Sequence, residues 1–523
     1  MAAQVPLQLR RRFPIPGWLL VATITVILAI SAFALLVRHW PFTESAVVQS
    51  LEAASSSKVR IGSFRSLYFP HPGCVARDVA FVHDPGSNGP PLITIRQLAV
   101  QSSFLGMLRH HVRTLRIDGM QIQIPRQTDE KFKSTSKFVI DELIANKATL
   151  IFPRAEKKPL EFSIHWGRLR NVGGSGAMLF EVRLSNPEPP GEIEASGSFG
   201  PWNGADAGHT PLSGHYIFQR ADLSIFHGIA GLLSSRGDFE GTLEHIAVQG
   251  SADTRNFTVT SSRHKADLKN QFQAVVNATT GETQLQRVDS QFRRTHLVST
   301  GIVAKHEGTH GTLTTLNVCS KAGRIQDLLL LFTKADRSPM TGSTSFCANV
   351  SLPAQERPFL RQVELEGDFG IDTGSFTTPQ TQENVNKLSA ESRDQDDHDP
   401  GTVLSGLKGH VKLIDGIATF TDLSFSIPGA FAQMQGTYDV ISHQVDLHGT
   451  LKMDASLSHT AHGAKALIMK FMEPFFKRKP QGSVVPVKLT GTYEMPSFGL
   501  DLNGQKENRT SKRLQQLYAT SSH

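Results

Sequence analysis

The sequence has few cysteines and few polar aromatic residues. Its three cysteines, Cys74, Cys319 and Cys347, are far apart, with no CxxC pair and no metal-site spacing. Two interpretations remain open: a single Cys319–Cys347 bridge in an oxidising compartment, or three small buried thiols. There are 5 Tyr and 4 Trp but 31 Phe. Since phenylalanine brings apolar area without a polar group that needs a partner, a large apolar surface is implied.

The sequence also lacks the local motifs of common enzyme classes. It contains no GxSxG, no Walker loop, no GxGxxG after a strand and no HExxH. The closely spaced histidines, His110-His111 and His459/His462, have no third ligand nearby in sequence. We therefore expect no enzyme, no catalytic or metal-binding residue and no cofactor. A net charge of +7 over 523 residues gives little support to nucleic-acid binding.

Long apolar runs are absent after residue 40, but one precedes it. Residues 17–37 carry no charge and follow Arg10, Arg11 and Arg12. About 20 apolar residues suffice to cross a bilayer, and the preceding positive charge places the N-terminus in the cytoplasm. The alternative is a cleaved signal peptide, because "AFA" at 32–34 resembles a cleavage site. We favour a retained anchor, since the run is long for a signal peptide, so the bulk of the chain faces the far side of one membrane.

Strand signals dominate the remainder. Polar-apolar alternation recurs, with turn signals every 8–14 residues. Short helices are expected only at a few places, such as 43–59, capped by Thr43 or Ser45, and 103–111. A G-x-hydrophobic step recurs in pieces such as "SGHYI", "TGIVA", "QGTYD" and "HGTLK". The fold class predicted is mainly β, built from stacked strand units.

Two DG pairs predict two-residue hairpin turns, at Asp118-Gly119 and Asp415-Gly416. The first turn would place on one face Leu115, Ile117, Met120, Ile122 and Ile124. The second would leave both faces of 411–429 apolar: Val411, Leu413, Ala418 and Phe420 on one, and Ile417, Leu423, Phe425 and Ile427 on the other. Alternation at 444–453 places together Val445, Leu447, Leu451 and Met453.

Two segments depart from the strand pattern. Residues 378–405 are polar, with a short helix in the first half and an acidic solvated loop in the second. Residues 462–476 form a helical stripe with a basic end, comprising Leu467, Ile468, Phe471, Met472 and Phe475, then Lys477, Arg478 and Lys479. This helix either covers the open end of the sheet, which we favour, or lies on a membrane surface.

The exported chain resembles the AsmA-like family of bacterial inner-membrane-anchored periplasmic proteins. The resemblance is densest in "LSGLKGHVKLIDGIATFTDLSFSIPGAFAQMQGTYD", "VDLHGTLKMDASLS" and "SVVPVKLTGTYEMPSFGLDL", and extends to "VRIGSF" and "LRIDGMQIQIP" near the start. It implies an elongated, twisted β-sheet curled into an apolar groove, as in bridge-like lipid-transfer proteins, and no catalytic residues.

The function expected is a periplasmic lipid-binding protein that takes part in phospholipid transport between the inner and outer membranes. Its partners would be a phospholipid or other acyl-chain lipid, the inner membrane and a further envelope protein. The alternative is a non-enzymatic envelope or outer-membrane assembly factor with a dry β core. The predicted divisions are a cytoplasmic tail, the anchor, a β-rich region, an acidic linker, a C-terminal region and a basic tail, at 1–16, 17–37, 43–377, 378–405, 406–502 and 503–523.

Overall fold

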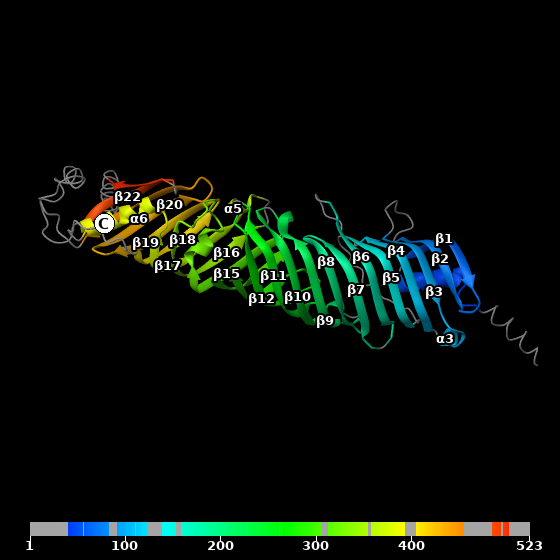
Figure 1. Cartoon of the computed structure of the whole chain (residues 1–523). Helices are drawn as coiled ribbons and strands as arrows, with labels where there is room; N and C mark the ends of the chain where they lie inside the picture. Colours follow the sequence, from blue (N-terminus) through cyan, green and yellow to red (C-terminus); the bar gives the residue numbers. More distant parts are fainter. Residues whose placement is uncertain are drawn as a thin grey trace, which may run out of the picture. The chain divides into compact units, whose positions relative to one another are not determined.

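The chain is mainly β, with a few short helices, as the strand patterns predict (Figure 1). The computed structural model describes residues 40–501, apart from 56, 83–91, 110, 124–138, 153–157, 175, 204–205, 227, 261, 263, 306–311, 354–356, 393–403, 454–483 and 493–494. The chain divides into an N-terminal unit, Met1–Pro153 with Arg170–Gly174, and a long unit, Arg154–Leu169 with Ser175–His523.

Several predictions fall outside the described residues. They are the anchor at 17–37, Ile124, the acidic loop that follows the short helix at 378–405, the helix at 462–476 with its basic end, and the tail at 503–523. Within the described part of the chain, no helix combines the length and apolar character that crossing a membrane requires.

The N-terminal unit is a sheet with a helix packed on it. Strands β1 to β4 pair antiparallel in chain order, and β5 pairs parallel to β4. The elements are α2 (Glu44–Ser55), β1 (Lys58–Leu67), β2 (Gly73–Val82), β3 (Ile93–Gln101), α3 (Phe104–Leu108), β4 (His111–Gln123) and β5 (Val139–Phe152). Both short helices, α2 and α3, lie where the sequence predicts them.

Helix α2 covers the apolar face of this sheet. It begins after Thr43, whose Oγ1 accepts a hydrogen bond from the backbone N of Ala46 at 3.4 Å, so Thr43 is the predicted cap. Val47, Val48 and Leu51 of the helix pack against the buried strand residues. The result is a packed core, in which the side chain of Val79 in β2 is only 1% exposed.

The predicted hairpin turn at Asp118-Gly119 is wrong. Strand β4 runs straight through this pair, and Asp118 is aligned with Gln97 of β3 on one side and with Asn146 of β5 on the other. Only Gly119 has a left-handed backbone there, with φ +68°, whereas a type I′ turn needs two such residues. The pair is therefore an irregularity inside a strand that is held by neighbours on both sides.

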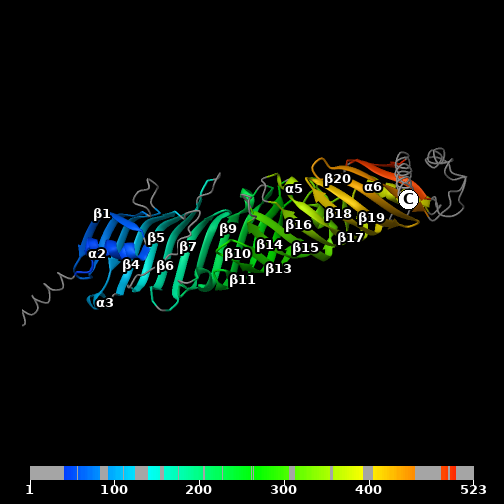
Figure 2. The same ribbon diagram turned by 180° about the vertical axis from the view of Figure 1, so that it is seen from behind.

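The long unit is a succession of antiparallel strands, each paired with the next in chain order from β7 to β23 (Figures 1 and 2). Strand β6 (Leu160–Val172) has residues in both units. The strands of the long unit are β7 (Met178–Pro187), β8 (Pro190–Phe199), β9 (Pro211–Asp222), β10 (Ile229–Thr242), β11 (His245–Val259), β12 (Ala266–Val276), β13 (Thr283–Phe292), β14 (Thr295–Lys305), β15 (Thr312–Arg324), β16 (Met340–Leu352), β17 (Glu364–Phe376), β18 (Leu404–Ile414), β19 (Ile417–Ile427), β20 (Ala430–Asp439), β21 (Gln444–Met453), β22 (Val484–Thr492) and β23 (Pro496–Leu500).

Helices in the long unit are short. They are α4 (Ile325–Leu329), α5 (Phe359–Gln362) and α6 (Pro379–Ser392), with 3₁₀ turns at Ala207–His209 and Leu223–Ile225. Helix α6 is the short helix predicted in the first half of 378–405. It packs on the sheet rather than serving as a linker: Val385 lies against the core of β19–β22, Ala390 is 1% exposed, and Ser389 Oγ donates to Pro428 O at 2.9 Å.

The hairpin predicted at Asp415-Gly416 is confirmed, but the predicted faces beyond it are wrong. Both turn residues have positive φ, 50° and 80°, as a type I′ turn requires. Further along β19, Asp422 also has positive φ, 52°, and the register with β20 shifts between Phe420 and Leu423. This bulge adds one residue, so Phe420 and Leu423 both pack in the same core and only one face is apolar.

Candidate functional site

The outstanding surface of the long unit is formed by two apolar rows that cross strands β7 to β16 at right angles. Each row follows residues directly opposite one another on successive strands. The first row is Val182, Ala195, Tyr216, Gly237, Gly250, Phe272, Val288, Ser299, Val318 and Ala348; the second is Phe180, Gly197, Gly214, Phe239, Val248, Ala274, Leu285, Gly301, Leu316 and Val350. Ser299 and the Tyr216 hydroxyl are the polar groups in them.

Most of the row residues are only half-buried. Ala274 and Ala348 are buried, whereas the large side chains, Phe239 and Phe272 among them, retain intermediate exposure. The three packed cores of the described residues involve residues of 40–143 and of 369–500. The apolar rows on β7 to β16 belong to none of these three cores, although helix α4 packs against β15 and β16.

Glycines shape this face. A Cβ on Gly250 would lie 2.5 Å from a backbone oxygen of β10 and 3.0 Å from the ring of Phe272, which leans over it. The rings of Phe180 and Phe239 lie on β7 and β10, about 14 Å apart at ordinary strand spacing, yet their centroids are 6.5 Å apart and stacked. They approach because the two residues between them, Gly197 and Gly214, have no side chains.

This arrangement explains the recurring G-x-hydrophobic step. Gly214 and Tyr216, or Gly301 and Val303, are two residues apart and so point to the same side of a strand. A side chain on the glycine would collide with the neighbouring strand: at Gly301 the added Cβ would meet the backbone oxygen of Thr315. At each step the glycine allows the neighbouring strand's backbone to approach closely. Large side chains from adjacent strands then cover the surface above the glycine, where no side chain projects.

A partly polar margin borders the first row. Ser235 lies beside it on β10, and Tyr216 Oη and Ser235 Oγ are 3.1 Å apart. Burial raises the pKa of the Tyr216 hydroxyl, against the opposing effect of this hydrogen bond. Asn270 and Ser290 continue the margin on β12 and β13. The face is thus apolar in its centre with hydrogen-bonding groups along one side, which suits a ligand that has an apolar body and a polar end.

The opposite face of the same strands is mostly polar, although it also exposes Leu179, Ile217, Val298 and Ile302. Ion pairs lie along it, including Arg287 Nε to Asp289 Oδ2 at 2.7 Å and Arg183 Nε to Glu194 Oε1 at 3.3 Å. The hydrogen bond from Arg287 lowers the pKa of the Asp289 carboxyl. A hollow of about 630 Å³ is lined mostly by residues of this face from β9 to β13. Among the described residues, no group of three or more His, Cys, Asp or Glu side chains could hold a metal ion.

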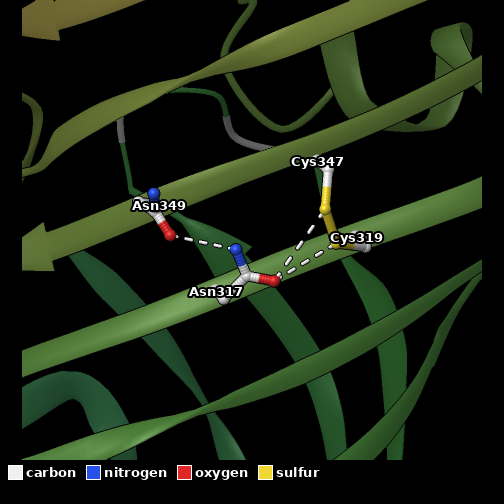
Figure 3. The surroundings of a disulfide bond; sticks show 4 residues. All are labelled: Asn317, Cys319, Cys347 and Asn349. Atoms are coloured by element: carbon white, nitrogen blue, oxygen red, sulfur yellow. Dashed lines mark hydrogen bonds between the residues drawn. A yellow bond between two sulfur atoms is a disulfide. The ribbon is translucent and has the colours of Figure 1, made fainter.

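A disulfide joins Cys319 of β15 to Cys347 of β16 on this polar face (Figure 3). Beside it, Asn317 Nδ2 donates to Asn349 Oδ1 at 2.9 Å, and Asn317 Oδ1 lies 3.3 Å from Cys319 Sγ. The bridge is the first of the two interpretations of the cysteines. Cys74 in the N-terminal unit is free and buried, and desolvation raises the pKa of its thiol to about 12.

The residues predicted to line a groove belong to hydrophobic clusters. In the long unit one core contains all seven predicted residues of β19 and β21: Leu423, Phe425, Ile427, Val445, Leu447, Leu451 and Met453. In the N-terminal unit Ile117 is buried beneath α2, with Leu115 and Met120 against it and Ile122 half-buried. The open rows on β7 to β16 were not singled out from the sequence, although the G-x-hydrophobic step marks several of their strands.

Comparison with known proteins gives no match: no family model, no curated protein and no solved structure is significantly similar to this chain.

Proposed function

We propose that the two apolar rows hold the acyl chains of a phospholipid. The observation that carries the proposal is the contrast within the long unit. Strands β19 to β22 bury their apolar residues in a packed core to which α6 contributes Val385, whereas β7 to β16 leave most of theirs half-buried. Burying apolar area gains roughly 25 cal/mol per Å², so an uncovered row favours an apolar ligand. A row of alkyl and aromatic side chains has no directional groups, so a lipid could move along it without chemistry.

The size of the surface suits this use. Ten strands at about 4.8 Å spacing make each row about 45 Å long. The hydrocarbon of one bilayer leaflet is about 15 Å thick, so the rows exceed the length of one acyl chain about threefold. We propose that the sheet curls around such chains to form a groove, and that the polar margin at Ser235 and Asn270 faces the headgroup side.

The wider proposal is a protein anchored in the bacterial inner membrane that takes part in phospholipid transport to the outer membrane, with a further envelope protein as partner. The resemblance of the exported chain to AsmA-like proteins, the apolar run at 17–37 and the three arginines before it support this location. The Cys319–Cys347 bridge also supports it, because disulfides persist in oxidising compartments such as the periplasm.

The test compares two variants, each of which adds one negative charge to a different face of the same strand. The variant Phe272→Asp charges the first row, and the control Gln273→Asp charges the exposed opposite face of β12. The full chain is purified, its bound phospholipid is measured by native mass spectrometry, and transfer of labelled phospholipid between vesicles is followed. We expect Phe272→Asp to lose bound lipid and transfer, while Gln273→Asp keeps both and circular dichroism is the same for the two.

The second candidate, an assembly factor with a dry core, is favoured by the packed core of β19–β22. If it is correct, the wild-type chain carries no phospholipid and moves none between vesicles. Phe272→Asp then unfolds the surrounding strands instead of causing the loss of a bound lipid.

A further inference from the structure

One edge of the N-terminal unit gathers segments that are distant in sequence. The β1–β2 turn and the segment joining β3 to β4 meet there, because Gly73 is aligned with both Leu67 and Gln101. Ser102 N donates to Pro72 O at 2.8 Å and ties the two connections together.

Large apolar side chains are exposed along this edge. Phe69 is 86% exposed and Tyr68 is 50% exposed in the β1–β2 turn, and Leu105 is 73% and Phe104 42% exposed in α3. Contiguous exposed apolar residues of this kind mark interaction surfaces more often than single ones do. We call these four residues the aromatic edge.

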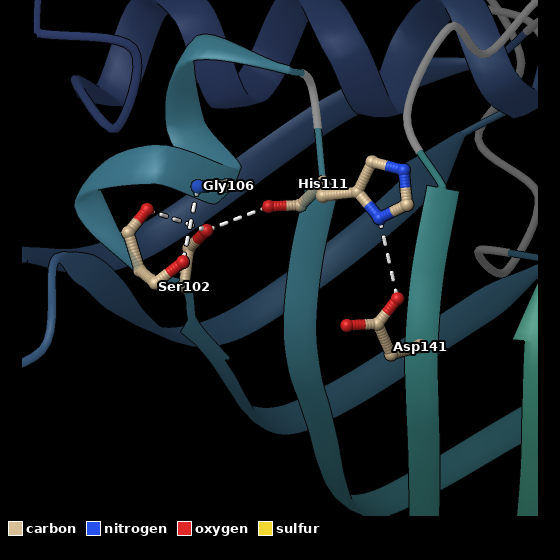
Figure 4. A network of polar contacts seen from close by, with 5 residues as sticks. Ser102, Gly106, His111 and Asp141 are labelled. Atoms are coloured by element: carbon tan, nitrogen blue, oxygen red, sulfur yellow. Dashed lines mark hydrogen bonds and ion pairs between the residues drawn. The ribbon is translucent and has the colours of Figure 1, made fainter.

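The connection that carries Phe104 and Leu105 is held in place by hydrogen bonds (Figure 4). Ser102 Oγ donates to His111 O at 2.6 Å, and Gly106 N donates to Ser103 Oγ at 3.0 Å. The buried Ser102 thus fixes the start of α3 against the start of β4. Phe104 and Leu105 are therefore exposed on a turn that is fixed by hydrogen bonds, whereas Met107 of the same helix packs against the core.

The chain enters the unit at the same edge. Trp40 is three residues beyond the apolar run at 17–37, and its ring lies 4.8 Å from that of Tyr68. Ser66 Oγ donates to Phe42 O at 2.9 Å, which fixes this entry point beside the end of β1. Trp and Tyr are the residues enriched at the interface between a bilayer and water.

Basic side chains surround the aromatic edge. Arg65, Arg109 and Arg113 are exposed on β1, after α3 and on β4. The exposed acid on the neighbouring strand end is Asp141 of β5, and its Oδ1 lies 3.3 Å from His111 Nδ1 (Figure 4). A surplus of arginine around exposed aromatic and aliphatic groups matches anionic phosphates above acyl chains.

We propose that the aromatic edge lies in the interface of a phospholipid bilayer. Phe69 and Leu105 enter the acyl-chain boundary, Tyr68 lies at the headgroup level beside the buried Trp40, and the arginines face lipid phosphates. The N-terminal unit is thereby seated on the membrane at a defined edge. This inference rests on the predicted span at 17–37 and goes beyond the proposed function, since it holds whether or not the apolar rows of the long unit bind lipid.

The test compares two labelled positions at opposite ends of β1. Phe69→Cys and Lys58→Cys each carry one NBD fluorophore on the full chain, reconstituted in vesicles of phosphatidylcholine and phosphatidylglycerol. The native Cys74 is buried and the other two cysteines are bridged, so each variant is labelled once. Lys58 is exposed and about 30 Å away along the ten-residue strand. Nitroxide groups on the lipid acyl chains should quench the label at 69 at least about twofold more than the label at 58, since 30 Å matches a whole hydrocarbon core.

Equal quenching at the two positions overturns the proposal, as does a chain that does not float with vesicles. A label at 69 that is shielded from aqueous iodide but not quenched from the acyl chains would indicate a protein partner at this edge, and also overturns it. The Phe272→Asp variant should lose lipid transfer but show the same quenching at positions 69 and 58 as the chain without it. Each of the two proposals can therefore be refuted without the other.

Discussion

The difference between a covered core and an open apolar face can be measured by removing one side chain from each. Leu451 lies in the core of β19–β22 and is 3% exposed. Leu451→Ala leaves a cavity that the surrounding side chains cannot fill, which costs about 3 kcal/mol. Phe272 is larger but half-buried on the open face of β12, so Phe272→Ala opens no closed cavity and loses only contacts to neighbouring strands, about 1 kcal/mol.

The assay is hydrogen exchange of the lipid-free chain, read by mass spectrometry on peptides from each region. If the free energy of local opening falls by these amounts, amide exchange becomes about 150-fold faster in β20–β22 for Leu451→Ala. For Phe272→Ala it becomes about fivefold faster in β11–β13. If Phe272→Ala accelerates exchange in its own strands as much as Leu451→Ala does, the rows are covered by a second layer, and the reasoning behind the proposed function is refuted.

Three further predictions follow from single contacts. Gly250→Ala should destabilise β10 and β11 by about 1–3 kcal/mol, because its Cβ has no room against β10, while Gly499→Ala, with nothing within 4 Å, should not change exchange. Cys319→Ser should lower the free energy of unfolding by about 3 kcal/mol, since the bridge closes a separation of 28 residues; a midpoint in urea equal to that of the reduced wild type would confirm that the bridge is the cause. The hydrogen bond to Asp501, 2.8 Å away, raises the pKa of His448, so its stabilising effect is complete below about pH 6.5 and is lost as pH rises through the raised value; NMR titration of the imidazole would check this, together with a fall at alkaline pH in the protection of amides at the end of β23 relative to their intrinsic exchange rates, and a pKa at or below the unfolded value would contradict it.

The class of fold could be predicted from the sequence because alternation and turn chemistry are local. The Asp415-Gly416 hairpin formed as predicted: both residues have positive φ, and Ile414 of β18 pairs with Ile417 of β19 directly across the turn. The same dipeptide at Asp118-Gly119 did not turn, because β4 is held by pairing with β3 and β5 on its two sides. That pairing brings together residues that are far apart in sequence, so it cannot be predicted from the dipeptide alone.

The candidate site was harder to predict, for two physical reasons. Alternation identifies the apolar side of a strand but says nothing about what lies over it, so the packing of Leu447 and Leu451 into one core could not be predicted. Helix α6, which contributes Val385 to this core, has no apolar stripe. It is held partly by polar contacts such as that of Ser389 with Pro428 O, and therefore looked like a linker.

The neighbour-to-neighbour order of strands in the long unit makes its length adjustable. Among the described residues, each strand from β8 to β22 pairs with the strands before and after it in the chain, so a duplicated pair of strands would keep each existing partner antiparallel and each apolar side on the same face. Each added pair would extend both rows by about 10 Å. A surface built in this way can be matched to the distance between two membranes by the number of hairpins alone, without redesign of any single site.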